Sequence, residues 1–179
     1  MKHFGTKNLE TQRLILRRFK VSDSKDMFLN WANDENVTKF LTWEPHQSIE
    51  ETKQLLADWV KSYNKSDYYQ WGIVLKEEDV LIGSIAAVKT DEELNIAEIG
   101  YCMGKKWWGK AIMAEALKRV IEFFFDEVEV KKVVAKHYID NINSGKVMKK
   151  AGMTYEKTVE EKFKEETRVM CYYLIKNEK

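Results

Sequence analysis

The order of strand-type and helix-type segments is the sequence feature that most restricts the fold of this chain. Apolar stripes with the helical period predict helices at residues 22–34, 48–63 and 112–124, and a short helix that begins near Asn143. The order β-α-α-β-β-β-α-β-α-β-β is not the regular alternation of a doubly wound protein. It predicts an α/β (α+β) fold in which helices pack on a mixed sheet. Alternating or β-branched apolar residues place the strands at residues 13–19, 70–75, 79–89, 94–104, 131–139, 153–160 and 167–176.

Local patterns support these elements. Ser48 and Glu51 have the spacing of a capping box at the start of the second helix. Residues 76–78 are expected to join two strands as a hairpin.

One proline and no Gly/Ser-rich stretch predict a single domain over residues 1–179. In the second helix the expected core stripe is Leu55, Leu56, Trp59, Val60 and Tyr63. In the third predicted helix it is Ile112, Met113, Ala116, Leu117, Val120, Ile121 and Phe124.

Composition excludes several classes of function. The formal net charge is +1, with acids and bases mixed along the chain, which argues against a nucleic-acid partner. Cys102 and Cys171 lie in apolar strand-type runs and are interpreted as reduced, half-buried thiols rather than as a disulfide or a reactive site. The polar N-terminal stretch and the lack of a run of about 18 apolar residues predict a cytoplasmic protein with no membrane partner. No His, Cys or carboxylate spacing indicates a metal site.

The stretch KKWWGKAIMAEAL, residues 105–117, places a glycine directly before a strongly amphipathic helix. Glycine at a helix start lets a ligand approach the backbone, and the first N–H groups of a helix favour an anion. Gly109 and Ala111 therefore predict an anion site. The pattern is neither a P-loop nor a dinucleotide fingerprint. An ordinary strand-to-helix turn remains the alternative.

Residues Lys106 to Ala111 resemble the signature [QR]-x-x-G-x-[GA] of the GNAT-superfamily N-acetyltransferases, with lysine at its first position. The chain is most similar to the branch that contains the ribosomal-protein N-terminal acetyltransferases. Segments 9–19, 41–52, 97–103 and 141–153 share the resemblance in the family's order. It implies a mostly antiparallel mixed sheet with a splayed central strand pair, and acetyl-CoA as cosubstrate. N–H groups of Trp108, Gly109, Lys110, Ala111, Ile112 and Met113 would bind pyrophosphate, and Tyr101, Cys102 and Met103 would line the pantetheine arm.

Three polar residues are candidates for the chemistry. Glu98 lies in an apolar strand, where a carboxylate suits a general base that takes a proton from an attacking ammonium. The resemblance supports this role, and a structural carboxylate paired with a lysine is the alternative. The resemblance also implies that Asn141 holds the donor and that Ser144 returns a proton to the leaving thiolate. Both can also cap a helix. Met148 stands where many relatives carry a tyrosine acid.

The acceptor is expected to be a primary amine, with a protein N-terminal α-amine preferred. A small amine such as a polyamine or aminoglycoside, or a non-catalytic acetyl-CoA-binding module, are the alternatives. Trp31, Trp43 and His46 are the candidate acceptor-site residues, although a surface-loop histidine is the favoured interpretation of His46. Direct attack is preferred over an acetylated Cys102 because an apolar strand raises the pKa of a thiol. A homodimer is a further possibility.

Overall fold

The structure is a computed structural model that describes residues 1–163 and 166–178. The strands are β1 (Leu9–Glu10), β2 (Leu14–Arg17), β3 (Gln70–Leu75), β4 (Val80–Asp91), β5 (Ile96–Met103), β6 (Lys132–Tyr138), β7 (Thr154–Phe163) and β8 (Glu166–Lys176). The helices are α1 (Ser24–Met27), α2 (Glu35–Thr38), α3 (Ile49–Ser62), α4 (Ile112–Phe123) and α5 (Ile142–Lys150). Wider π-type turns continue α1 through Phe28–Ala32 and α4 through Phe124–Val128, and single 3-10 turns occupy Val21–Asp23 and Lys105–Trp107.

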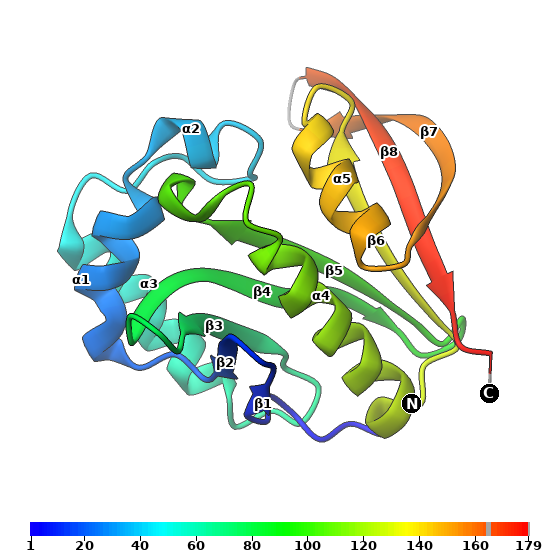
Figure 1. Ribbon diagram of the computed structural model, residues 1–179, viewed down its shortest axis with the longest axis horizontal. Coiled ribbons are helices and arrows are strands. Elements are labelled where there is room, and N and C mark those ends of the chain that lie inside the picture. Colours follow the sequence, from blue (N-terminus) through cyan, green and yellow to red (C-terminus); the bar gives the residue numbers. More distant parts are fainter. Residues whose placement is uncertain (164–165, 179) are drawn as a thin grey trace.

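The described residues form one sheet with the strand order β1-β2-β3-β4-β5-β6-β8-β7 (Figure 1). Every neighbouring pair is antiparallel except β5 and β6, which are parallel. The sheet is therefore mixed and mostly antiparallel, as the segment order and the resemblance predicted.

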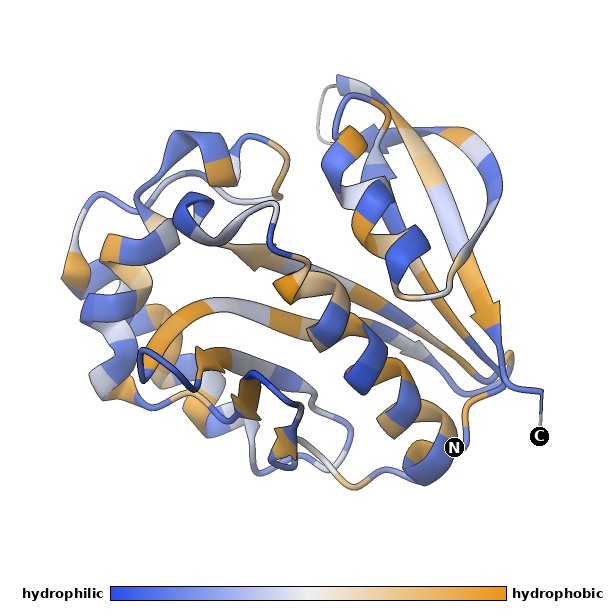
Figure 2. Cartoon of the chain, in the orientation of Figure 1, coloured by the Kyte–Doolittle hydropathy of each residue, from blue (hydrophilic) through white to orange (hydrophobic). Residues whose placement is uncertain are grey.

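Helices pack on both faces of the sheet. The apolar stripe of α4 is buried against alternate residues of the central strands, among them Ala97, Ile99 and Val133. Residues of α1 and α3, such as Met27 and Leu56, form a second core on the opposite face. Figure 2 shows hydrophobic and hydrophilic residues side by side along α4 and α5, as expected for helices that bury one face only.

The central strand pair separates along its length. β5 pairs with β6 only over Ile96–Glu98, opposite Lys132–Val134, whereas β6 pairs with β8 along its whole length. Figure 1 shows β5 and β6 together near their first residues and apart at their far ends, with α5 on the β6 side of the opening. Because β5 stays paired with β4 up to Met103, the sheet opens on one side of β5 only.

Most local predictions are confirmed, and two need correction. The whole predicted stripe of α4 is buried. In α3, Leu56 and Tyr63 are buried but Val60 is 37% exposed, so its assignment to the core was wrong. Ser48 accepts the N–H of Glu51 at 3.2 Å, but the Glu51 carboxylate accepts the N–H of Gln47 rather than that of Ser48. Both cysteines are free, half-buried thiols. Among the described residues no helix has the length and apolarity that crossing a membrane requires.

Candidate active site

A cleft of about 510 Å³ opens where β5 and β6 separate. It is bounded by β3 to β8 and by residues of α1, α3 and the segment after α2. The predicted residues Trp31 and Trp43 line it, whereas His46 is not among its lining residues. Its polar or reactive lining side chains include Ser84, Glu98, Tyr101, Cys102, Lys136, Asn141 and Ser144.

The loop before α4 has the backbone shape of an anion site. Gly109 and Ala111 both adopt the left-handed conformation, with φ of +78° and +57°. A Cβ built on Gly109 meets no protein atom within 4 Å, so open space lies beside the backbone there. Within the described residues, no hydrogen-bond acceptor is found for the N–H groups of 109–113. These unpaired donors at a helix N-terminus are the groups that an anion requires.

The first predicted donor needs correction. The N–H of Trp108 donates to the carbonyl of Lys105 at 3.1 Å, so it is not free for a ligand. The Trp108 indole donates to the carbonyl of Met103 at 2.7 Å and fastens the loop to the end of β5. Trp107 is 2% exposed and packs so closely under Gly104 that a Cβ there would lie 2.7 Å from its ring. The bulky residues beside Gly109 therefore anchor the loop.

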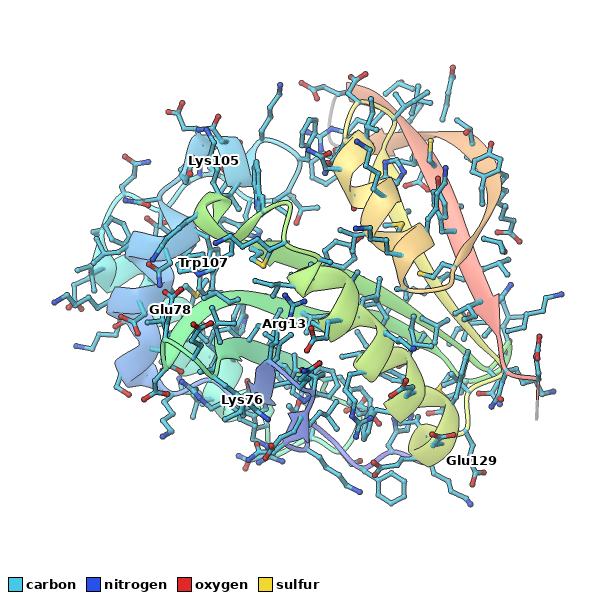
Figure 3. The ribbon with its side chains drawn as sticks, in the orientation of Figure 1. Arg13, Lys76, Glu78, Lys105, Trp107 and Glu129 are labelled. Carbon is cyan, nitrogen blue, oxygen red and sulfur yellow. The ribbon has the colours of Figure 1, made fainter. Side chains whose placement is uncertain are left out.

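An ion pair and an arginine hydrogen bond hold this loop from the β1–β4 side of the molecule. Lys106 contacts Glu78 at 3.3 Å. Arg13 donates to the carbonyl of Lys110 at 3.0 Å and pairs with Glu115 of α4 at 2.6 Å. Figure 3 shows Lys105 and Trp107 on the loop, Glu78 near Trp107, and Arg13 beside α4. The position of the loop therefore depends on residues far away in the sequence.

Replacement of Glu115 by glutamine tests this support. Burial acts to raise the pKa of Glu115, but hydrogen bonds from Thr11 and Arg13 outweigh it and lower the pKa. A lowered pKa in the folded state contributes stability that is present above the unfolded pKa and lost as pH falls through the folded value. Glu115→Gln should therefore lower the free energy of unfolding by about 1–3 kcal/mol at pH 7. The NH2 group of the glutamine would face the N–H groups of Arg13, so that a hydrogen bond would be lost.

Urea denaturation at several pH values measures this effect. The difference from the wild type should begin to shrink as pH falls below the ordinary glutamate value of about 4.3 and should vanish once pH has fallen through the lower pKa of the folded state, where the wild-type carboxylate is protonated. Glu122→Gln, at an exposed position of the same helix, is the matched control and should stay near the wild type. A pH-independent difference for Glu115→Gln would contradict a role for its charge.

The free side of β5 provides an edge beside the loop. Beyond Glu98 no strand of the described residues pairs with this side of β5, so the backbone from Gly100 to Met103 can bind an extended ligand. Burial raises the pKa of the Cys102 thiol to about 11. Its Sγ lies 4.0 Å from the hydroxyl of Ser84. At neutral pH Cys102 is therefore a protonated thiol, a poor nucleophile.

At the N-terminus of α5, the hydroxyl of Ser144 forms a pair with the hydroxyl of Tyr101 from β5. Asn141 caps the helix by accepting the N–H of Ser144 at 3.4 Å, so the capping interpretation is confirmed. The hydroxyls of Tyr101 and Ser144 lie 2.9 Å apart, and that of Tyr101 is also 3.0 Å from the Ser144 carbonyl. Burial raises the pKa of Tyr101, so its hydroxyl stays protonated. Met148, in contrast, is buried in the core.

Glu98 lies beside charged residues. Its carboxylate is 3.6 Å from the ammonium of Lys136, which lies 3.0 Å from the carboxylate of Glu161. Tyr172 donates to Glu161 and lies 3.3 Å from Lys136. Glu98 has apolar neighbours along its own strand, as the sequence indicated, but charged partners from β6 and β7 face it, and the lysine of the structural interpretation is Lys136. Lysine pairing and a role as base are compatible, because an ionised carboxylate is the form that accepts a proton.

The acceptor-side candidates have different environments. Trp31 is fully buried, and its indole N–H has no hydrogen-bond partner within the described residues. His46 is 8% exposed, with Nδ1 2.7 Å from the Thr52 hydroxyl and its ring 5.1 Å from that of Trp43. The interpretation of His46 as a surface histidine was wrong, because the loop folds onto α3. Burial lowers its pKa, so it is neutral at physiological pH.

The sequence interpretation missed the partners of Glu98. Lys136 is an isolated charge within an apolar strand, the same signal that singled out Glu98 itself. Glu161 and Tyr172 carry no comparable local signal, because charged and polar residues surround Glu161 in its strand. Among residues 1–163 and 166–178 there is no group of three His, Cys, Asp or Glu side chains suited to a metal ion.

Comparison with known proteins agrees with this geometry. A family model described as "Acetyltransferase (GNAT) domain" matches residues 13–154. The N-acetyltransferase YnaD of Bacillus subtilis, itself uncharacterized, is 30% identical over 150 residues, which cover 83% of this chain and 84% of that protein. The ribosomal-protein-serine acetyltransferase of Escherichia coli is 28% identical over 110 residues, or 62% of this chain and 60% of that one.

A solved structure shares the fold. The crystal structure of a GNAT-family acetyltransferase from Bacillus anthracis superposes with a TM-score of 0.83 at 23% identity, covering 97% of this chain and all of that one. The family model extends from β2 to the start of β7 and includes the loop before α4, the open edge of β5 and the N-terminus of α5. The chain belongs to the GNAT family and is an acetyl-CoA-dependent N-acetyltransferase.

Proposed function

We propose that this enzyme transfers the acetyl group of acetyl-CoA to a protein N-terminal α-amine by direct attack. The observation that carries the proposal is the cleft between β5 and β6: Glu98 lines it where the two strands stop pairing, and the β5 edge that also lines it leads at Met103 into the anion loop. The similarity to the Escherichia coli ribosomal-protein-serine acetyltransferase supports a protein N-terminus as acceptor.

Donor binding is assigned to the loop and the free edge. The five N–H groups of 109–113 would receive the pyrophosphate, with the exposed Lys105 and Lys110 adding positive charge nearby. Tyr101, Cys102 and Met103 would pair with the pantetheine arm through their backbone groups. Asn141, at the N-terminus of α5, would hold the arm from the opposite side of the cleft.

Three groups of the chain would carry the chemistry. Bound acetyl-CoA supplies a thioester whose carbonyl carbon the amine attacks. Glu98 takes the proton of the acceptor ammonium, directly or through water. Backbone N–H groups near Cys102 stabilise the negative charge that develops on the carbonyl oxygen. Ser144 returns a proton to the departing thiolate and regains one from solvent, while the hydroxyl of Tyr101, 2.9 Å away, orients the Ser144 hydroxyl.

A thiol-release assay tests this function. Acetyl-CoA is offered with N-terminal peptides, polyamines or aminoglycosides, and mass spectrometry locates the acetyl group on each product. The proposal predicts release with peptides and acetylation of their α-amine. Turnover confined to the small amines would contradict the proposed acceptor. Tight acetyl-CoA binding without turnover on any amine would identify a binding module.

Direct attack predicts that Cys102 is dispensable. Cys102→Ala should retain most of the activity, because a thiol with a pKa of about 11 is protonated at neutral pH. Initial rates with both substrates varied should give intersecting double-reciprocal lines. Parallel lines, together with acetylated Cys102 detected by mass spectrometry in the absence of acceptor, would show a covalent route instead.

A further inference from the structure

The face of β6, β7 and β8 that lines the cleft carries charges that donor binding does not use. Lys136, Tyr138, Glu161, Phe163 and Arg168 all line the cleft with Glu98. Glu161 and Arg168 are direct cross-strand partners. Glu98, Lys136 and Glu161 are called the negative group here and Arg168 the positive group; Glu161 and Arg168 make the two groups neighbours across β7 and β8.

The negative group contains one cation and two carboxylates. Lys136 lies between Glu98 and Glu161, at 3.6 and 3.0 Å. Tyr172 donates to Glu161 and adds no charge. The two carboxylates of this group exceed its one ammonium by one charge, and the cations Lys162 and Arg168 also line the cleft. The Glu98 and Glu161 carboxylates are the groups that attract the ammonium of an acceptor to the side of the proposed base.

The positive group is the guanidinium of Arg168. It lies between two aromatic rings, 4.1 Å from the centre of Phe163 and 4.7 Å from that of Tyr138. Its Nε pairs at 3.3 Å with Glu166, whose side chain is 72% exposed, so this pair is weak. Its Nη1 is buried and has no hydrogen-bond partner within the described residues. A flat guanidinium held by rings, with a buried donor left over, suits a carboxylate.

We propose that Arg168 binds an acidic side chain at the second or third position of the acceptor peptide. The inference rests on the proposed function in requiring a peptide acceptor. Tyr138, beneath the guanidinium, is two residues beyond Lys136 on β6, or about 7 Å along the strand. An extended peptide crosses that distance in about two residues. In a free α-amino acid only one carbon separates the amine from the carboxylate. Such a molecule cannot place its amine beside Glu98 and its carboxylate on Arg168 at the same time.

Peptide competition tests the proposal. Three peptides differ only at positions 2 and 3, which are both acidic, both the corresponding amides, or both lysine. For the wild type, kcat/KM should be about tenfold higher for the acidic peptide than for the amide peptide, as one charged hydrogen bond provides. Salt should reduce this preference. Arg168→Gln should abolish it and leave the amide peptide unaffected, and Arg168→Glu should favour the lysine peptide.

Two further variants separate charge from structure. Arg168→Lys keeps the charge without the planar fork and should retain part of the preference, even if Arg168→Gln fails to fold. Lys176→Glu reverses a charge at the far end of the same strand, outside the cleft, and should leave the preference unchanged. Equal kcat/KM for all three peptides with the wild type would overturn this inference alone. Acetylation of none of them would overturn the proposed acceptor as well.

Discussion

Replacement of Glu98 by glutamine is expected to lower kcat by about 10²–10⁴, the contribution typical of a general base. Glutamine keeps the shape of the side chain but cannot take a proton from the acceptor ammonium. Coenzyme A affinity, measured by calorimetry, should stay near the wild type because the anion loop is distant from this residue. The loss in kcat should shrink at high pH, where the amine is deprotonated by solvent.

Glu161→Gln is the matched control for this experiment. Lys136 lies closer to Glu161 than to Glu98, at 3.0 against 3.6 Å, so Glu161→Gln removes the shorter of its two ion pairs. If Glu98 serves only to pair with Lys136, the two variants should lose similar activity. A role as base predicts that Glu161→Gln changes kcat less than tenfold. Full activity of Glu98→Gln at neutral pH would return Glu98 to a structural role.

Substitution of Gly109 should weaken coenzyme A binding by about 10–10²-fold, with the larger effect for valine than for alanine. The open space beside Gly109 is where the pyrophosphate would contact the backbone, so an added side chain displaces it from its N–H donors. Loss of one or two charged hydrogen bonds corresponds to an affinity change of this size. Calorimetric titration of the folded variants with coenzyme A measures it directly.

Gly152→Ala separates ligand exclusion from backbone strain. Gly152 also has a positive φ, +92°, and the nearest atom to a Cβ there is Ile175 Cδ1 at 3.6 Å. Gly109→Ala and Gly152→Ala should therefore lose similar stability, each about 1 kcal/mol, in thermal unfolding. Only Gly109→Ala should lose affinity. Unchanged affinity in both Gly109 variants would refute the anion site.

The local elements of this fold could be predicted because their signals are local. The period of the apolar residues in 112–124 encodes the buried face of α4. The short polar connection predicted at 76–78 indicates a hairpin, and the structure has one with residues 76–79 between β3 and β4. The glycine before α4 likewise predicted a special backbone, and Gly109 and Ala111 adopt it. The splayed strand pair and the donor were implied by the resemblance, which the family model supports.

Cross-strand partners could not be predicted in this way. The ion pairs of Glu98, Lys136 and Glu161 join three separate strands, and the Tyr101–Ser144 hydrogen bond joins a strand to a distant helix. His46 is buried only because its loop folds against Thr52.

The sequence by itself determined the element order, the helix faces and the loop that suits an anion, since neighbouring residues set periodicity and turn geometry. Only the tertiary structure decided which charges face Glu98, that Tyr101 meets Ser144, and that a buried N–H donor of Arg168 has no partner among residues 1–163 and 166–178. Strand register and the early separation of β5 from β6 control these contacts. Both depend on the packing of the whole sheet, which no local pattern encodes.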